Sequence, residues 1–424
     1  MTMTSELIWG FAFFAGALAR LVARLSGWPS VVVLLASGLL IGDAGLDWVQ
    51  PEALGGGLES LVGLLVSLVL FDGGLNLRLA GRDLQRAVLQ LVLTRGLLGL
   101  AGGALLAHEL AGLSWPLAWV FGAIALGTGP TVITPLVQQM RLVPRLSTVL
   151  GAEGLILEPV LALLLLQLAL GDLSQWDQVL PLLLLRLGGG VLIGSLSGWL
   201  LVLVLERLPR EAEGLKLQLS LGVLFLLVSG TQVLLPEAGL PAAVSAGVVV
   251  GLGLKEEASS LDALIAHLAQ LAITVLFPLL AADLSWGELS PLGWGGVSCV
   301  AALMLFRWLV VQAGSLGLPG LSWGDKLMLS WVAPRGIVTA AVASLFALKL
   351  DAAGTPGGGA LKGLVFLTIL ITVAVQGLSA PLLARRLGLV ESDLEAALDA
   401  SPGLAAGLEQ QPGGEQVGAL EAAE

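Results

Sequence analysis

The chain has 424 residues, of which 56% are hydrophobic and only 12% are charged. Soluble domains carry about 25% charged residues, so this composition excludes a soluble protein as a whole. The formal net charge is −11, and residues 391–424 contribute eight Asp or Glu and no Lys or Arg. We expect that stretch to be a disordered acidic tail. No cluster of His and Cys suggests a metal centre, and no cofactor is predicted.

Thirteen apolar stretches follow one another along the chain, and a bilayer-spanning helix needs about 20 such residues. The sequence therefore predicts an all-α polytopic membrane protein, with residues 1–390 as its membrane domain. The shortest stretch is 239–254. The predicted spans cover residues 5–25, 28–46, 57–77, 87–111, 114–139, 146–170, 178–205, 215–235, 239–254, 262–282, 290–318, 325–348 and 361–384.

Basic residues cluster in alternate loops, and acidic residues occupy the loops between them. Lys349 and Lys362 are exceptions, because they fall on the acidic side. The positive-inside rule then places the N-terminus outside the cell and the C-terminus in the cytoplasm, in the cell (inner) membrane. The basic loops contain Arg20, Arg24, Arg78, Arg82, Arg86, Arg141, Arg145, Arg207, Arg210, Lys216, Lys255, Lys326, Arg385 and Arg386.

An odd number of spans allows two inverted six-helix repeats joined by a linking helix. The first repeat would cover residues 5–171, the linking helix 178–205 and the second repeat 215–388, all approximately. Inverted repeats of this kind are typical of secondary transporters. In this arrangement the fifth span corresponds to the twelfth, and we expect these two discontinuous helices to cross.

Both of these spans contain helix-breaking residues near their middle. The fifth holds Gly127, Thr128, Gly129 and Pro130, and the twelfth holds Pro334 with its neighbours Arg335 and Gly336. Proline removes a backbone donor, and the freed carbonyls and helix ends can bind ions. Ordinary proline kinks are the alternative, but matching interruptions favour a site at the middle of the membrane.

Two glutamates lie at membrane depth in the sixth span. Glu158 can hold a proton or a metal cation but not both, which by itself would give exchange; a permanently protonated structural Glu158 is the alternative. Glu153 lies five residues earlier, about 140° around a helix, so the two cannot share a face. We expect Glu153 to pair with Arg335, because a buried arginine without a carboxylate is costly. Arg95 lies nearer the cytoplasmic third, where snorkelling suffices.

Asp72 ends the third span in the sequence FDGG. It can line the cytoplasmic mouth of an ion pathway, or it can be an interfacial acid beside Arg78. The residues alone leave both possibilities open.

Five motifs, in this order, carry a family resemblance. FDGG at 71–74 resembles FEGG, GTGPTVITPL at 127–136 resembles a TDP span, and GAEGLILEPV at 151–160 lines up with EGESLLNDAV. APRGIVTAAVASL at 333–345 resembles GWRGAVSLALAL, and residues 372–389 resemble TVxxQGLTxPxLxRRLGL. With these motifs the chain resembles the NhaP-type sodium/proton antiporters of the monovalent cation:proton antiporter family.

The resemblance implies thirteen spans, a homodimer in the lipid bilayer and elevator-like alternating access, with no nucleic-acid partner. It places Glu158 on the family's ion-binding carboxylate and Thr128 on the threonine whose backbone helps to coordinate the ion. Asp72 falls on the FEGG carboxylate, and Glu153 and Arg335 fall on the bracing ion pair. The transported metal would be Na⁺ or K⁺ at Glu158, with no structural metal.

Three polar positions of the family are lost here, as Leu157, Gly129 and Gly154. Fewer side-chain oxygens make K⁺ or weak selectivity more plausible than in typical members, and a single essential carboxylate favours electroneutral one-for-one exchange. Two other functions stay open: a different transporter on the same scaffold, such as an organic anion symporter, or a non-transporting degenerate homologue. No nucleophile–base pair indicates an enzyme.

Overall fold

The computed structural model describes helices throughout, with one isolated antiparallel bridge, Leu142 to Val390, among the described residues. The described residues are 5–54, 56–77, 82–170, 176–209, 212–236, 238–254, 259–318, 320–336, 339–340, 343–344, 346–347, 350 and 356–391.

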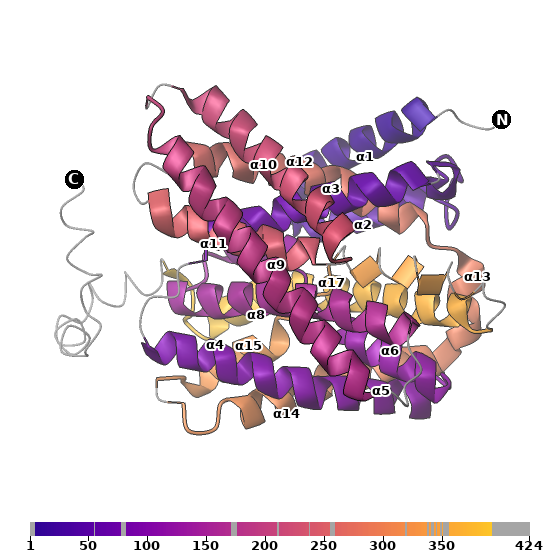
Figure 1. The fold of residues 1–424 in the computed structure, drawn as a ribbon. Coiled ribbons are helices and arrows are strands. Elements are labelled where there is room, and N and C mark those ends of the chain that lie inside the picture. Colours follow the sequence, from indigo (N-terminus) through magenta and orange to yellow (C-terminus); the bar gives the residue numbers. More distant parts are fainter. Residues whose placement is uncertain are drawn as a thin grey trace.

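The helices form two bundles that pack against each other (Figure 1). The first bundle contains α1 (Ser5–Ser26), α2 (Ser30–Ile41), α3 (Gly56–Leu75), α9 (Trp176–Leu205), α10 (Glu213–Leu234), α11 (Gly239–Leu254) and α12 (Ser259–Ala282). The second contains α4 (Arg82–Thr94), the π-helix η2 (Arg95–Gly99), α5 (Leu100–Glu109), α6 (Trp115–Leu126), α7 (Pro130–Met140), α8 (Pro144–Leu170), α14 (Gly293–Gly314), α15 (Trp323–Trp331) and α17 (Gly358–Arg386). Short helices η1 (Pro51–Leu54), α13 (Trp286–Leu289) and η4 (Ser290–Leu292) lie in the connections.

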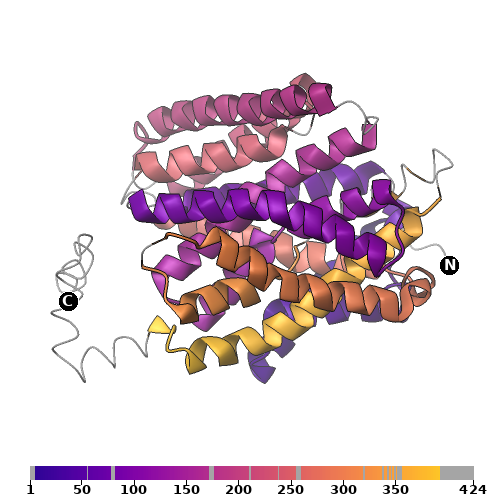
Figure 2. The ribbon, with the colours of Figure 1, turned by 90° about the horizontal axis from the view of Figure 1, so that it is seen from below.

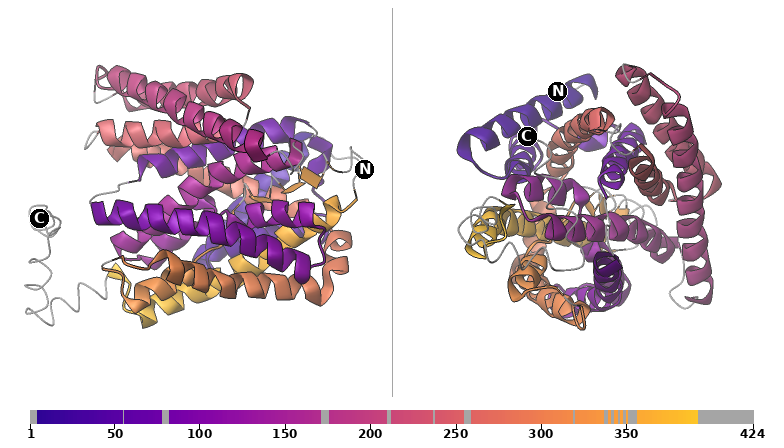
Figure 3. Two further views of the ribbon diagram at one scale, coloured as in Figure 1. Left: turned by 60° about the horizontal axis from the view of Figure 1, so that its bottom comes forward. Right: turned by 90° about the vertical axis from the view of Figure 1, so that its left-hand side faces the viewer.

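The long helix α9 follows α8 and lies at the edge of the molecule when the bundles are seen end-on (Figure 3, right). Helix α1 begins at the right-hand end in Figure 1, and α17 ends at the left-hand end in Figure 2, which keeps the same horizontal axis. The first and last helices therefore start and finish on opposite ends of the bundles, as an odd number of crossings requires.

Apart from the non-helical residues 127–129 and 332–336, helices occupy the predicted spans where the structure describes them, with ends that differ by a few residues. Seven helical segments among the described residues are long and apolar enough to cross a membrane on their own, which defines a polytopic membrane protein. The other spans are shorter or interrupted. The count of thirteen and the inverted repeats stay predictions, and the expected tail after Glu391 lies outside the described residues.

Close backbone contacts hold the helices where glycine has no side chain to separate them. In the FDGG sequence, Gly74 lies against the backbone of Val244, and Gly247 of α11 lies against the carbonyl of Phe71. A Cβ atom at either glycine would overlap the facing helix. The second glycine of FDGG therefore serves the packing of α3 against α11.

Candidate functional site

The first predicted break is present between α6 and α7. The helix ends at Leu126, residues 127–129 are not helical, and α7 begins at Pro130. Proline fits the first position of a helix because its missing N–H would have no intrahelical partner there. Gly127, Thr128 and Gly129 are all buried, and Thr128 has no exposed surface. The break therefore places a threonine backbone inside the protein.

The second predicted break follows α15, where Val332 to Gly336 are not helical. Side chains bond the amides that the break frees: the Ala333 amide donates to Gln376 Oε1 (3.1 Å) and the Arg335 amide to Thr372 Oγ1 (3.4 Å). Both acceptors lie on α17 and are buried. In the hydrocarbon region backbone groups must find partners within the protein, and these residues of the TVAVQG motif supply them.

A buried charge cluster lies between the two breaks, and Glu153 of α8 is its centre. Its carboxylate forms ion pairs with Arg95 of η2 through Oε1 and with Arg307 of α14 through Oε2 (3.0 Å). The side chains of all three residues are at most 6% exposed. Each carboxylate oxygen thus faces a guanidinium group, and the ion pairs offset part of the large cost of burying these charges.

Each arginine of the cluster also bonds one of the interrupted helices. Arg95 Nη1 donates to Thr128 Oγ1 (3.1 Å) in the first break. Arg307 Nη2 donates to the carbonyl of Leu329 (2.9 Å) and to that of Val332 (3.3 Å), at the end of α15. These carbonyls have no amide partner within the helix, and a positive charge is favourable at a helix C-terminus. Glu153 therefore links both breaks through two arginines.

The expected ion pair between Glu153 and Arg335 is wrong: among the described residues, the ion pairs of Glu153 are those with Arg95 and Arg307. Arg335 is buried within electrostatic range of the cluster, but its Nη1 donates to the carbonyl of Ala333 in its own loop (3.2 Å). The expectation that Arg95 snorkels is also wrong, because Arg95 is only 5% exposed and points inward to Glu153.

Sequence analysis missed Arg307, which is 5% exposed in the middle of α14. The signal was available, because a charged residue in the run LMLFRWLVV is as costly in a bilayer as Arg335. The same reasoning would have added Arg307 to the candidate partners of Glu153, although it does not show which arginines form the pairs.

The structure positions the remaining candidate residues in part. Glu158 lies on α8, but its side chain is outside the described residues, as is that of Pro130. Asp72 is buried and accepts a hydrogen bond from Asn76 Nδ2 (3.3 Å). Its carboxylate lies close enough to that of Asp262 on α12 for their charges to interact.

One contact relates the helix of Asp72 to α8. Gly73, beside Asp72, contacts Leu155 of α8, between the two glutamates of that helix. Pro334 and Gly336 are buried in the second break. Asp72 thus lies on a helix that faces α8 rather than in the cluster of Glu153.

A second charged cluster lies at the start of α17. Lys362 Nζ forms ion pairs with Asp283 Oδ2 (3.1 Å) and Glu288 Oε1 (3.1 Å), and Ser344 Oγ donates to Asp283 Oδ2 (2.8 Å). Lys362 is one of the two lysines that fell on the acidic side of the predicted topology. Asp283 and Glu288 explain this exception, because they are acidic residues on that same side and neutralise its charge. Asp283 directly follows α12 of the first bundle, whereas Lys362 belongs to the second.

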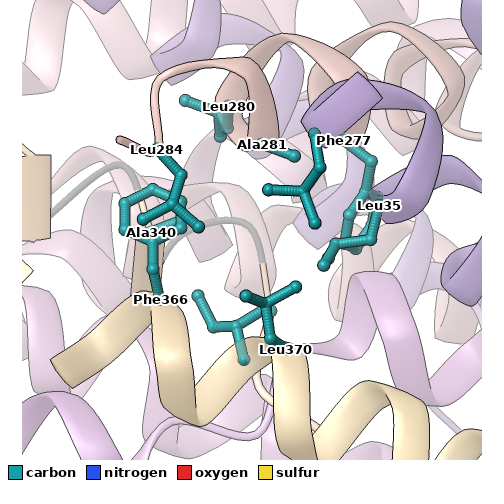
Figure 4. A pocket seen from close by; sticks show the side chains of 11 residues that line it. Leu35, Phe277, Leu280, Ala281, Leu284, Ala340, Phe366 and Leu370 are labelled. Carbon is teal, nitrogen blue, oxygen red and sulfur yellow. The ribbon is translucent and has the colours of Figure 1, made fainter. Parts of the chain in front are cut away.

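An apolar pocket lies between the bundles beside the second break (Figure 4). Leu35 of α2 and Phe277 of α12 lie on one side of it, and Phe366 of α17 lies on the opposite side with Ala340. Gly336 also lines the pocket. This lining offers no ligand to a cation. No group of His, Cys, Asp or Glu that could hold a metal ion occurs in the described part of the chain.

Membrane-spanning helices, two of them interrupted at depth, and a buried charge cluster between the interruptions are features of a secondary transporter. Residues 10–386 match the family model described as sodium/hydrogen exchanger, transmembrane. The chain belongs to this family of cation/proton antiporters, which are transporters rather than enzymes.

Similar proteins include the K(+)/H(+) antiporter NhaP2 of Shewanella sp. (strain ANA-3), 26% identical over 90% of this chain and 68% of that protein. Na(+)/H(+) antiporter 1 of Methanocaldococcus jannaschii is 25% identical over 89% of this chain and 94% of that protein. The solved structure of the sodium proton antiporter MjNhaP1 from M. jannaschii is similar with a TM-score of 0.78 at 23% identity, covering 89% of this chain and 97% of that one. This last likeness shows a shared fold.

Proposed function

We propose that this protein exchanges a monovalent cation, Na⁺ or K⁺, for H⁺ across the membrane, and that Glu158 is the carboxylate that both ions share. The observation that carries the proposal is the pair of buried breaks joined through Glu153. Glu158 lies on the same helix, about 7.5 Å further along its axis. Its backbone therefore lies between one and two helical turns from the residue that links both breaks.

The two ions exclude each other at one carboxylate, which couples their movements. A proton neutralises Glu158, and a cation must meet the ionised form, so the site carries one or the other. With one charge exchanged for one charge, the exchange is electroneutral. Leu157 and Gly129 provide no side-chain oxygens, so backbone carbonyls and water complete the coordination of the cation.

The proposal includes alternating access, in which one bundle moves against the other. The second bundle contains both breaks and moves, and the first bundle is the scaffold at which two copies meet. The apolar pocket beside Gly336 supports this, because contacts without directional bonds can slide. The protein lies in the cell (inner) membrane, with its N-terminus outside the cell and its C-terminus in the cytoplasm.

The test is a pH dye in everted membrane vesicles, to which NaCl, KCl, LiCl or CaCl₂ is added. The wild type restores dye fluorescence with Na⁺, K⁺ or both, and Glu158→Gln abolishes the response. Glu206→Gln is the matched control, because Glu206 is exposed just after α9. A Glu158→Gln protein that still exchanges cations contradicts the proposed role of Glu158.

One observation favours a second candidate, anion transport on the same scaffold. Among the described side chains near the breaks, three guanidinium groups are buried (Arg95, Arg307 and Arg335), and one carboxylate, Glu153, lies within electrostatic range of all three. Half-helix N-termini also bind anions. A wild-type protein that gives no cation-dependent signal but takes up a labelled organic carboxylate would support this candidate. A protein inert in both assays is a non-transporting homologue.

A further inference from the structure

We propose that Arg95 is a positioning residue for the cation site: it holds the hydroxyl of Thr128, so that the backbone carbonyl of Thr128 is the oxygen presented to the cation. This inference rests on the proposed cation/proton exchange. Nothing in the sequence motifs involves Arg95.

Arg95 begins η2, a five-residue π-helical turn in the middle of an otherwise α-helical span. Such turns are rare and frequently mark functional sites, because they shift the register of all the side chains that follow. The span also approaches α6 closely: Gly99 contacts the side chain of Leu126, the last residue before the first break. Gly103 lies against Gly122 of α6, backbone to backbone. These glycines fix η2 alongside the end of α6.

The guanidinium group of Arg95 is buried and bonds only groups inside the protein among the described residues. It binds Glu153 and donates to Thr128 Oγ1 at 3.1 Å, and Thr128 is completely buried. A long arginine side chain near a helix end could reach water instead. Hydrogen bonds from an ionised donor are shorter and roughly twice as strong as those between neutral groups. Arg95 therefore fixes Thr128 to the ion-paired core of the second bundle.

Thr128 is the single residue with a side chain in the segment 127–129, because both of its neighbours are glycines. Glycine leaves the backbone conformationally free, so the Thr128 hydroxyl is the side-chain group through which a hydrogen bond can fix this segment. A cation that used the same hydroxyl would meet the positive charge of Arg95 directly. The hydroxyl is thus a tether, and the carbonyl of Thr128 remains as the ligand.

The first experiment measures amide hydrogen exchange of the purified full-length protein in detergent, over peptides that cover residues 121–135. We expect Thr128→Val and Arg95→Gln each to speed exchange in these peptides by about tenfold or more, the size of one lost charge-assisted hydrogen bond. Thr128→Ser keeps the hydroxyl oxygen, so its amide hydrogen exchange is expected to be as slow as in the wild type. Arg86→Gln is the matched control, because Arg86 is exposed on α4. Unchanged exchange in these peptides, or an increase spread over all helices, overturns the tether.

The second experiment measures KM for the cation and kcat in vesicles. We expect each variant to raise KM by about tenfold while kcat changes less. The double variant Arg95→Gln/Thr128→Val should raise KM no further than Arg95→Gln alone, because that change already removes the hydrogen bond to Thr128. The positioning role is overturned if the double variant raises KM by the product of the two single effects, or if the variants lower kcat and leave KM unchanged. A wild-type protein without cation/proton exchange overturns the proposed function instead, and hydrogen exchange then still decides whether Arg95 holds Thr128.

Discussion

The charged clusters around Glu153 and Lys362 have opposite compositions. Around Glu153, one carboxylate serves two arginines, and their side chains are 4–6% exposed. Around Lys362, one lysine serves two carboxylates, and their side chains are 10–21% exposed. Arginine presents a rigid planar fork, whereas lysine presents a compact charge on a flexible stem. The first cluster thus requires a fixed geometry, and the second tolerates adjustment.

The clusters also join different parts of the fold. Glu153, Arg95 and Arg307 belong to α8, η2 and α14, all within the second bundle. Lys362 of the second bundle instead pairs with Asp283, which directly follows α12 of the first. The comparison indicates that arginines brace the interior of the bundle that we propose moves. The ion pair of Lys362 with Asp283 lies where the two bundles meet, which is where the proposed motion would change their relative position.

The largest expected effect comes from breaking the inner cluster. Glu153→Gln leaves two buried arginines without their carboxylate, and we expect a loss of about 3–5 kcal/mol in the free energy of unfolding. Thermal or denaturant unfolding of the detergent-solubilised protein measures it. Glu153→Asp keeps the charge and is expected to lose less. An unchanged unfolding midpoint for Glu153→Gln would mean that the cluster does not brace the breaks.

The outer cluster is expected to contribute less. Lys362→Met leaves Asp283 and Glu288 without their shared cation but nearer to water, and we expect a loss of about 1.5–3 kcal/mol. Lys362→Arg is the control, since it keeps the charge. The same unfolding measurement applies. If Lys362→Met proved as costly as Glu153→Gln, the contrast between a fixed and an adjustable cluster would be wrong.

Removing a neutral partner of the second break tests whether charge alone holds the site. Gln376→Leu leaves the buried amide of Ala333 without its acceptor. We expect a loss of about 1–3 kcal/mol. Faster hydrogen exchange in peptides that cover residues 328–336 locates the effect. Gln376→Glu retains an acceptor oxygen and should protect this amide better than leucine does. Equal exchange in the leucine variant and the wild type would contradict the assignment.

The smallest effect is expected at a third ion pair, on the outside of the second bundle. Arg145 bonds Asp325 at 2.9 Å, but its side chain is 55% exposed. Asp325 keeps its capping box with Ser322 when Arg145 is removed. The Asp325 side chain is buried but keeps its hydrogen bonds with Ser322, and the lost charge of Arg145 lies at the surface, where water and ions screen it. We therefore expect Arg145→Ala to change the free energy of unfolding by no more than about 0.2–1 kcal/mol. A loss of several kcal/mol for Arg145→Ala would show that the exposure of an ion pair does not determine how much it contributes to stability.

The sequence predicted both breaks and the buried role of Glu153, because proline, glycine and charge are unambiguous at membrane depth. It did not predict which arginine pairs with Glu153. That choice depends on how far each helix is rotated, and the π turn at Arg95 shifts this rotation within its own span. It also depends on competition, since Arg335 donates to the carbonyl of Ala333. Apolar pattern gives the depth of a residue in the membrane but not the direction in which its side chain points.

The central claim is that Glu158 carries either a cation or a proton. Its most direct test is simultaneous measurement of cation efflux and proton uptake in proteoliposomes of purified protein, with the membrane potential clamped at different values. The account predicts one proton for each cation, rates that do not depend on the potential, and neither flux in Glu158→Gln. Cation movement without protons, or coupled exchange that persists in Glu158→Gln, would contradict it.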